Sequence, residues 1–155
     1  MHISHDGSSN EEIIAYSDSD WAGDKESRKS ITGNFVTCAQ GPVSWVSRKQ
    51  KTVALSSTEA EYMALSDCSR QLIWIKQLLK ELQFNSDIPI LHGDNQGSLF
   101  WSENAVTEKH SKHIDIRYHY ICNLIEQKKI ILNFIEGKNN PADILTRNLG
   151  GILFS

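Results

Sequence analysis

The chain has 155 residues, of which 39% are hydrophobic and 23% charged, and its formal net charge is −3 at pH 7. Such a composition indicates one globular domain, and the slight negative charge gives no bulk attraction for nucleic acid, so any such binding would have to come from local patches. No apolar run reaches the roughly 20 residues that a membrane span needs, and we expect no membrane partner. The N-terminus is polar and shows no signal peptide, and three widely spaced cysteines predict reduced thiols.

The order of the predicted elements indicates an α/β domain. We expect a flexible lead-in over residues 1–11, a folded domain over 12–150 and a tail over 151–155. Within the domain, residues 12–21 predict a strand that runs into a loop. Residues 33–55 predict short strands in a meander, with a turn at Gly41 and Pro42.

A long helix follows, from Ser57 to about Leu82, because apolar residues recur there at helical spacing. The later segments predict, in order, a strand, two helices, a strand and a last helix, over residues 86–95, 96–104, 112–129, 129–137 and 139–149. Asn140 is the expected N-cap of the last helix and Pro141 its first residue. Three strands before the first helix and strands between helices after it predict a mixed sheet.

Two glutamates near the start of the long helix point in different directions. With about 100° per residue, Glu61 lies within about 40° of the apolar stripe, which is formed by Leu65, Cys68, Leu72 and Leu79. Glu59 lies about 160° away on the polar face. A carboxylate among core residues is costly unless it is paired, protonated or bound to a metal, so Glu61 is a site candidate.

Glu59 has a structural interpretation. The run from Ser56 to Glu59 fits a capping box, in which Ser56 is the N-cap and the Glu59 carboxylate accepts from the amide of Ser56. We therefore expect Glu59 to start the helix rather than to take part in chemistry.

Four further acids follow predicted strands or open a helix, and each has a structural interpretation beside a functional one. Asp18 and Asp20 end the first strand, as site residues or as turn formers. Asp94 follows an apolar strand, as a site residue or as an N-cap. Asp143 lies in the first turn of the last helix, where it complements the helix dipole. Spacing alone cannot bring residues on four elements together.

Basic and histidine-rich segments are open to similar alternatives. Arg48, Lys49 and Lys51 form one basic cluster and residues 109–119 another, either of which is also ordinary surface charge. A zinc site is excluded for the second cluster, because its candidate ligands would point in different directions from one helix. Those candidates are His110, His113, His119 and Cys122.

Several blocks resemble the ribonuclease H domain of copia-class retrotransposon polyproteins. They include "YSDSDWAGD", "SSTEAEYMAL", "HGDNQGSL", "HSKHIDIRYHYI" and "NNPADILT", and the resemblance runs from about Ile13 to Leu149. It implies the ribonuclease H fold, with a five-stranded mixed sheet of three antiparallel and then two parallel strands, flanked by helices.

The resemblance also implies a catalytic site of four acids that bind two Mg²⁺ ions, for which Mn²⁺ can substitute. By motif, these acids are Asp18, Glu61, Asp94 and Asp143. The implied reaction is hydrolysis of the RNA strand of an RNA–DNA hybrid during reverse transcription, which leaves 5′-phosphate and 3′-hydroxyl ends. Many ribonucleases H carry a histidine in the loop before the last helix, whereas here residues 136–141 contain none, as is common in the retrotransposon class.

Binding residues and partners follow from the same resemblance. Contacts to RNA 2′-hydroxyls are expected from Ser57, Asn95 and Gln96, and contacts to a DNA phosphate from Ser56, Arg48 and Lys49. The expected partners are the hybrid and the polymerase region of the same polyprotein, in a cytoplasmic retrotransposon particle or in the nucleus. A catalytically silent module that binds hybrids or the polymerase is the alternative. A transposase- or integrase-type nuclease on the same fold is disfavoured by the "SSTEAEY" and "NNPADILT" blocks.

Overall fold

A computed structural model describes residues 11–94 and 112–147 of the chain. Its five strands form one sheet in the order β3-β2-β1-β4-β5. Strands β1 (Ile13–Asp20), β2 (Ile31–Cys38) and β3 (Gly41–Lys49) are antiparallel neighbours. Strands β4 (Ile90–Gly93) and β5 (Ile131–Phe134) continue the sheet in parallel with β1. The predicted fold class, with three antiparallel and two parallel strands, is confirmed.

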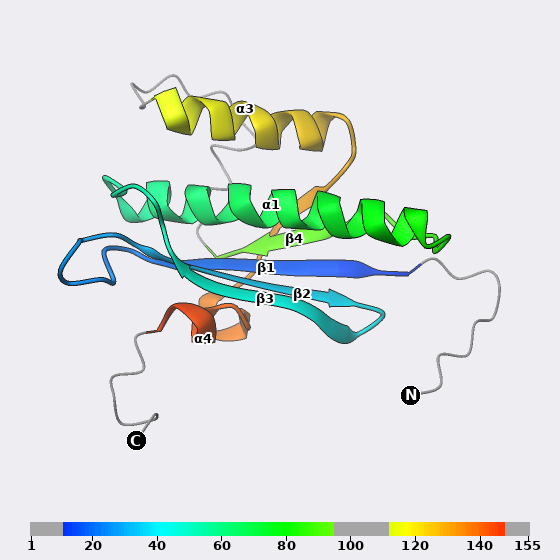
Figure 1. Cartoon of the computed structure of the whole chain (residues 1–155), viewed down its shortest axis with the longest axis horizontal. Coiled ribbons are helices and arrows are strands. Elements are labelled where there is room, and N and C mark those ends of the chain that lie inside the picture. The colour runs from blue at the N-terminus through cyan, green and yellow to red at the C-terminus, as the bar shows by residue number, and fades with distance from the viewer. Residues whose placement is uncertain (1–10, 95–111, 148–155) are drawn as a thin grey trace.

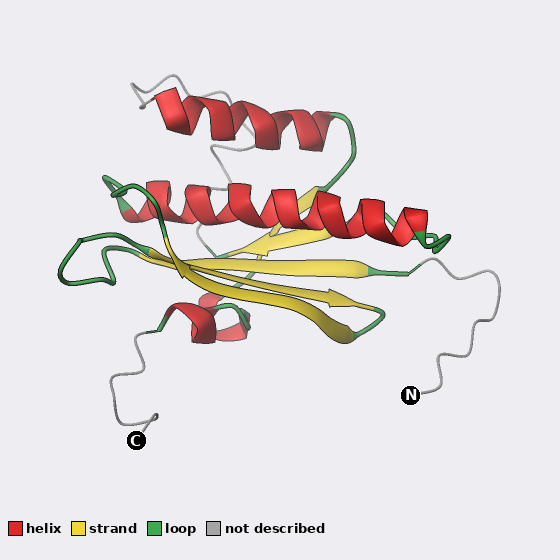
Figure 2. Ribbon diagram, viewed as in Figure 1, coloured by secondary structure: helices red, strands yellow, loops and turns green. Residues whose placement is uncertain are grey.

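The helices lie on both faces of this sheet (Figure 1). Helix α1 (Ser57–Glu81) packs on the sheet, and α3 (Lys112–Glu126) packs on α1. The short α4 (Asp143–Thr146) lies on the opposite face, against β1, β2 and β3, after the 3₁₀ turn η1 (Gly137–Asn139). Figure 2 shows the same arrangement by type of element. Within the described residues, no helix is long and apolar enough to cross a membrane.

The first half of α1 is buried on all sides. Residues 60–66 are all buried, because this part of the helix lies between the sheet and α3. Further along, burial recurs at Cys68, Leu72 and Ile75, which is the single stripe that the sequence predicts. The core therefore lies between the sheet, α1 and α3, and it includes Ile13, Leu65, Leu91, Ile121 and Ile130.

The predicted turn at Gly41 and Pro42 is wrong, because these residues begin β3 instead. The hairpin turns at Ala39 and Gln40, whose φ angles are 51° and 65°. A two-residue turn with both φ angles positive matches the twist of an antiparallel pair, and here it forms without the glycine or asparagine that usually adopts such angles. Pro42 is tolerated because β3 is an edge strand.

The predicted start of the last helix is also wrong, because α4 begins at Asp143 rather than at Pro141. Asn140 caps a turn before the helix, where its Oδ1 accepts from the amide of Ala142 at 3.1 Å. Its Nδ2 donates to the carbonyl oxygen of Ser17 in β1 at 3.0 Å. This hydrogen bond links the loop before α4 to β1, the central strand of the sheet.

Some predictions fall on parts of the chain that the structure does not describe. They are residues 1–10 of the lead-in predicted over 1–11, the helix over 96–104 and the tail over 151–155. Glu11 is described, and its amide donates to the carbonyl oxygen of Asn85 at 2.8 Å. The folded part therefore includes residue 11.

Candidate metal centre

Three of the predicted acids meet at one edge of the sheet. Asp18 lies near the end of β1, Glu61 near the start of α1 and Asp94 directly after β4. One carboxylate oxygen from each lies within 4.8 Å of the others, and this is the only such group of metal-binding side chains among the described residues. The parallel pairing of Ser17 with Gly93 explains the meeting, because it aligns the carboxyl ends of β1 and β4.

Burial and mutual repulsion shift the pKa values of these acids. Asp18 is 5% and Glu61 is 7% exposed. Burial, followed by the negative charges of Asp18 and Asp94, raises the pKa of Glu61 to about 9. Burial also raises the pKa of Asp18 to about 6, with a hydrogen bond from Thr146 opposing it and the charges of Asp94 and Asp143 adding to it. The pKa of Asp94 is raised as well, mainly by burial.

Glu61 is held in place by the backbone of the neighbouring strand. The amide of Ser19 donates to Glu61 Oε1 at 3.0 Å, and this contact links α1 to the end of β1. The bond fixes one oxygen of the carboxylate relative to Asp18, which precedes Ser19 in the chain.

Glu59 has the structural role that the sequence predicts, with one difference. The amide of Glu59 donates to Ser56 Oγ at 3.1 Å, so Ser56 is the N-cap of α1. The Glu59 carboxylate, however, accepts from the amide of Leu55 at 2.9 Å, so the predicted bond to the Ser56 amide is wrong by one residue. The amide that Glu59 binds therefore belongs to Leu55, the residue before the N-cap.

Asp143 lies at the border of the cluster. Its charge raises the pKa values of Asp18 and Asp94, which places it nearby. Its Oδ2 accepts from Arg147 Nη2 at 2.5 Å, within the same short helix. The structure therefore brings three predicted acids within ligand distance of one another and leaves the fourth paired with a cation.

Three residues that the sequence did not predict as part of the site hold or accommodate α4 at this edge. Thr146 Oγ1 lies 2.5 Å from Asp18 Oδ2, and Asn140 is bound to β1 as described above. Gly33 in β2 lies under α4, where an added Cβ would be 2.7 Å from the carbonyl oxygen of Ala142. A threonine three residues after an acid gives no signal in sequence, whereas Asn140 gave one that was assigned to a helix cap.

The donor set fits a hard divalent cation. Three carboxylates this close repel one another, and burial deprives them of water, so in the absence of a cation they tend to hold protons. Oxygen-only ligands suit Mg²⁺ or Mn²⁺ rather than zinc. The cluster can thus bind such an ion in exchange for protons.

The two predicted phosphate-binding cations are already paired. Arg48 Nη2 lies 3.1 Å from Asp67 Oδ2, and Asp67 also pairs with Arg117 at 2.9 Å. Lys49 Nζ lies 2.9 Å from Asp24 Oδ2. Both cations remain about half exposed, so solvent reaches them.

The other predicted binding residues give a mixed result. Ser56 uses its hydroxyl as the helix cap, and Ser57 is exposed at the first position of α1. Asn95 and Gln96 lie outside the described residues.

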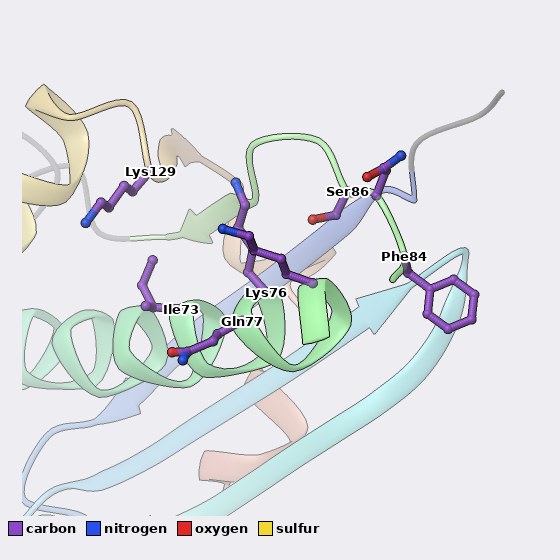
Figure 3. Close-up of a pocket in the computed structure, with 8 residues that line it drawn as sticks. Ile73, Lys76, Gln77, Phe84, Ser86 and Lys129 are labelled. Atoms are coloured by element: carbon purple, nitrogen blue, oxygen red, sulfur yellow. The ribbon is translucent and has the colours of Figure 1, made fainter. Parts of the chain in front are cut away.

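A hollow lies far from the acids, at the other end of α1 (Figure 3). It has a volume of about 520 Å³ and contains Lys76, Lys80 and Lys129 in its lining. Lys80 lies in the last turn of α1, where a cation complements the helix dipole, and Lys129 follows the end of α3. Nineteen residues of helix put Lys80 about 28 Å from Glu61 along the axis, so this hollow is separate from the acid cluster.

Comparison with known sequences finds relatives among transposon polyproteins. The chain is 39% identical over 141 residues to the retrovirus-related Pol polyprotein from transposon TNT 1-94 of Nicotiana tabacum, which covers 91% of this chain. It is also 39% identical over 143 residues to the Pol polyprotein from transposon RE2 of Arabidopsis thaliana, which covers 92%. The chain spans only 11% and 10% of these two relatives. No protein-family model matches the chain.

Comparison with solved structures finds the same fold. One match is LC11-RNase H1, isolated from compost by a metagenomic approach, in complex with an RNA/DNA hybrid. Its TM-score is 0.63 at 14% identity, over 86% of this chain and 93% of that one. Prototype foamy virus protease-reverse transcriptase matches with a TM-score of 0.52 at 13% identity, over 94% of this chain and 21% of that one.

Proposed function

Because the chain is homologous to a segment of copia-type, retrovirus-related Pol polyproteins and has the ribonuclease H fold, we propose that it is a metal-dependent ribonuclease H. Its substrate is the RNA strand of an RNA–DNA hybrid formed during reverse transcription. The observation that carries the proposal is the buried cluster of Asp18, Glu61 and Asp94 at the carboxyl ends of β1 and β4.

The proposed ligands of the metal are the three clustered acids together with Asp143. When bound, two Mg²⁺ ions, or Mn²⁺ in their place, supply an activated water and stabilise the leaving oxygen. Asp143 has to exchange its bond to Arg147 for this role. Glu61 has to release a proton, because its pKa of about 9 keeps it protonated near neutral pH without a cation.

The remaining residues of the site orient these carboxylates. The amide of Ser19 holds Glu61, and the buried surroundings reduce competition from water. In the reaction, a water oxygen bonds to phosphorus and the bond between phosphorus and the 3′ oxygen breaks. The products carry a 5′-phosphate and a 3′-hydroxyl.

The loop before α4 offers no histidine to assist proton transfer or product release. Lys138, the cation of this loop, lies 2.8 Å from Glu136 and is largely exposed. We therefore expect slow turnover rather than loss of activity.

Arg48, Lys49, Ser56 and Ser57 are the proposed contacts to the hybrid, together with Asn95 and Gln96, which follow Asp94 in the sequence. Arg48 and Lys49 would exchange carboxylate partners for phosphates. Such an exchange costs little, because exposed ion pairs are worth at most about 1 kcal/mol. The proposed protein partner is the polymerase region of the polyprotein, since the relatives are Pol polyproteins.

The test is a cleavage assay with a labelled RNA–DNA hybrid, duplex DNA and duplex RNA, in Mg²⁺ or in EDTA. We expect cleavage of the hybrid's RNA strand alone, only with metal, and none by Asp94→Asn. Glu61→Gln should also abolish cleavage, whereas Glu59→Gln should cost about 1 kcal/mol of stability at most. Equal loss of cleavage in the two glutamate variants, with the fold intact, would contradict the assignment.

A second outcome would replace the proposal. Tight binding of the hybrid without cleavage, in both Mg²⁺ and Mn²⁺, would identify the chain as a silent ribonuclease H-like module. The binding would be measured by fluorescence anisotropy with the same labelled hybrid.

A further inference from the structure

Helix α4 brings a hydroxyl group, as well as an acid, to the metal centre. Thr146 is 3% exposed, and its Oγ1 lies 2.5 Å from Asp18 Oδ2. The two residues are 128 positions apart in the chain, so this contact is a product of the fold. Among the described residues, it is a direct side-chain hydrogen bond between α4 and one of the three clustered acids.

The Thr146 hydroxyl has one proton and two acceptors within reach. Its Oγ1 lies 3.0 Å from the carbonyl oxygen of Asp143 and 2.5 Å from the Asp18 carboxylate. A charged acceptor at the shorter distance makes the stronger hydrogen bond, so the proton is donated to Asp18 whenever Asp18 is ionised. The hydroxyl then has no proton left to donate to the carbonyl oxygen of Asp143.

Two contacts with the sheet fix the position of Thr146. Its Cγ2 lies only 2.7 Å from where a Cβ on Gly33 would be, so the methyl group sits directly on β2. Asn140 ties the preceding loop to Ser17, next to Asp18. A rigid donor on this helix can therefore select one orientation of the carboxylate.

We propose that Thr146 is a positioning residue, which holds Asp18 Oδ2 by a hydrogen bond and thereby raises the affinity of the acid cluster for a divalent cation. This inference rests on the proposed function, in which the cluster binds metal. Without the hydroxyl, the carboxylate is free to rotate about its Cβ–Cγ bond. Ordering it then becomes part of the free energy of binding the ion. Partners of this kind typically contribute about 10- to 100-fold to metal affinity.

The test is a titration of Mn²⁺ into the metal-free protein, followed by calorimetry and by the electron paramagnetic resonance signal of free Mn²⁺. Thr146→Val keeps the shape of the side chain and removes the donor, so we expect the dissociation constant to rise about tenfold. Thr146→Ser restores the donor and should stay within about twofold of wild type by the same reasoning. Equal affinity in wild type and Thr146→Val would overturn the proposal.

Thr37→Val is the matched control. Thr37 in β2 donates from Oγ1 to the carbonyl oxygen of Ile14 at 3.3 Å, so the same substitution removes a comparable bond away from the cluster. Its Mn²⁺ affinity should equal that of wild type. Thermal unfolding of each variant in EDTA shows whether the fold is retained. A Thr37→Val affinity as weak as that of Thr146→Val would mean that general loosening explains both, and it would also overturn the proposal.

Cleavage of the hybrid separates this inference from the function on which it rests. In Thr146→Val, the Mn²⁺ concentration for half-maximal cleavage should rise about as much as the dissociation constant. A wild-type protein that binds Mn²⁺ but does not cleave would contradict the ribonuclease activity alone. A wild-type protein that binds no Mn²⁺ would overturn both.

Discussion

Glu61 shows how a single residue can reveal a site before its partners are known. Helical spacing places it on the apolar stripe, and the structure shows it buried beside Asp18 and Asp94. Its pKa rises to about 9 because it is buried and because those two charges repel its ionised form. The glutamate that looks out of place on the apolar stripe is thus the residue that is costly to ionise in the folded protein.

This shift predicts how the stability of the metal-free protein depends on pH. From about pH 4.5 to about 9, native Glu61 holds a proton that the unfolded chain has released. Its stabilising contribution is therefore complete below pH 4.5 and is lost as pH rises towards 9. Asp18 contributes in the same direction, and its stabilising contribution is lost as the pH rises towards about 6. The free energy of unfolding should fall between pH 6 and 8, by at most about 1.4 kcal/mol per pH unit for Glu61.

Urea denaturation in EDTA at pH 6, 7 and 8 measures this slope. Glu61→Gln should flatten it and should be the more stable protein at pH 8, because it does not have to take up a proton on folding. Glu59→Gln, whose carboxylate caps the helix end, should keep the wild-type slope. A slope in Glu61→Gln as steep as in wild type would show that another group is responsible.

At the scale of elements, the sequence predicts what periodicity controls and misses what packing controls. Helix α1 begins at Ser57 and ends at Glu81, close to the predicted bounds, because its cap and apolar spacing are local. That residues 60–66 are buried all round depends on α3, which no local pattern reveals. Ala39 and Gln40 form the β2–β3 turn although neither residue signals one.

Helix α4 depends on one small residue beneath it. A Cβ at Gly33 would lie 2.7 Å from Thr146 Cγ2 and 3.0 Å from Leu145 Cβ, so Gly33→Ala should push α4 off the sheet. We expect a loss of about 1–3 kcal/mol in the free energy of unfolding. Hybrid cleavage should fall further than stability accounts for, because Asp143 and Thr146 move with the helix. Chemical denaturation and the cleavage assay measure the two effects.

Gly41→Ala is the control for this substitution. The nearest atom to its added Cβ is the carbonyl oxygen of Cys38 at 3.7 Å, which is ordinary contact, and its φ angle is not positive. It should be close to neutral in both measurements. Full cleavage by Gly33→Ala would show that the position of α4 does not matter for activity.

For the whole molecule, the site depends on long-range topology. The acids that we propose as metal ligands come from β1, from α1, from the residue after β4 and from α4, and sequence spacing gives no reason for them to meet. The motif resemblance predicts that these acids form one site. For three of them the structure supplies the physical reason, because β4 runs parallel to β1 beneath α1. The pairing of Asp143 with Arg147 and the hydroxyl of Thr146 required coordinates.

A cation that joins three elements should stabilise the whole fold. The proposed metal would bind the native cluster and not the unfolded chain, so free metal at 100 times its dissociation constant should add about 2.7 kcal/mol. For a domain of this size, that raises the melting temperature by roughly 5–10 °C. Differential scanning calorimetry in EDTA and in increasing Mn²⁺ measures the shift, and Asp94→Asn should reduce it. An unchanged melting temperature in wild type would exclude a metal site of useful affinity.

The edge strand β3 bears on how the protein behaves in a concentrated solution. Val43 and Trp45 are 49% and 64% exposed on this strand, and an open strand with such side chains can recruit further strands from other chains. Pro42 removes one backbone donor from β3, and the pairing with β2 shifts register between Val36 and Thr37. Arg48 and Lys49 add charge near its other end. These features interrupt the regular ladder that edge-to-edge aggregation requires, so they protect the domain from forming intermolecular sheets.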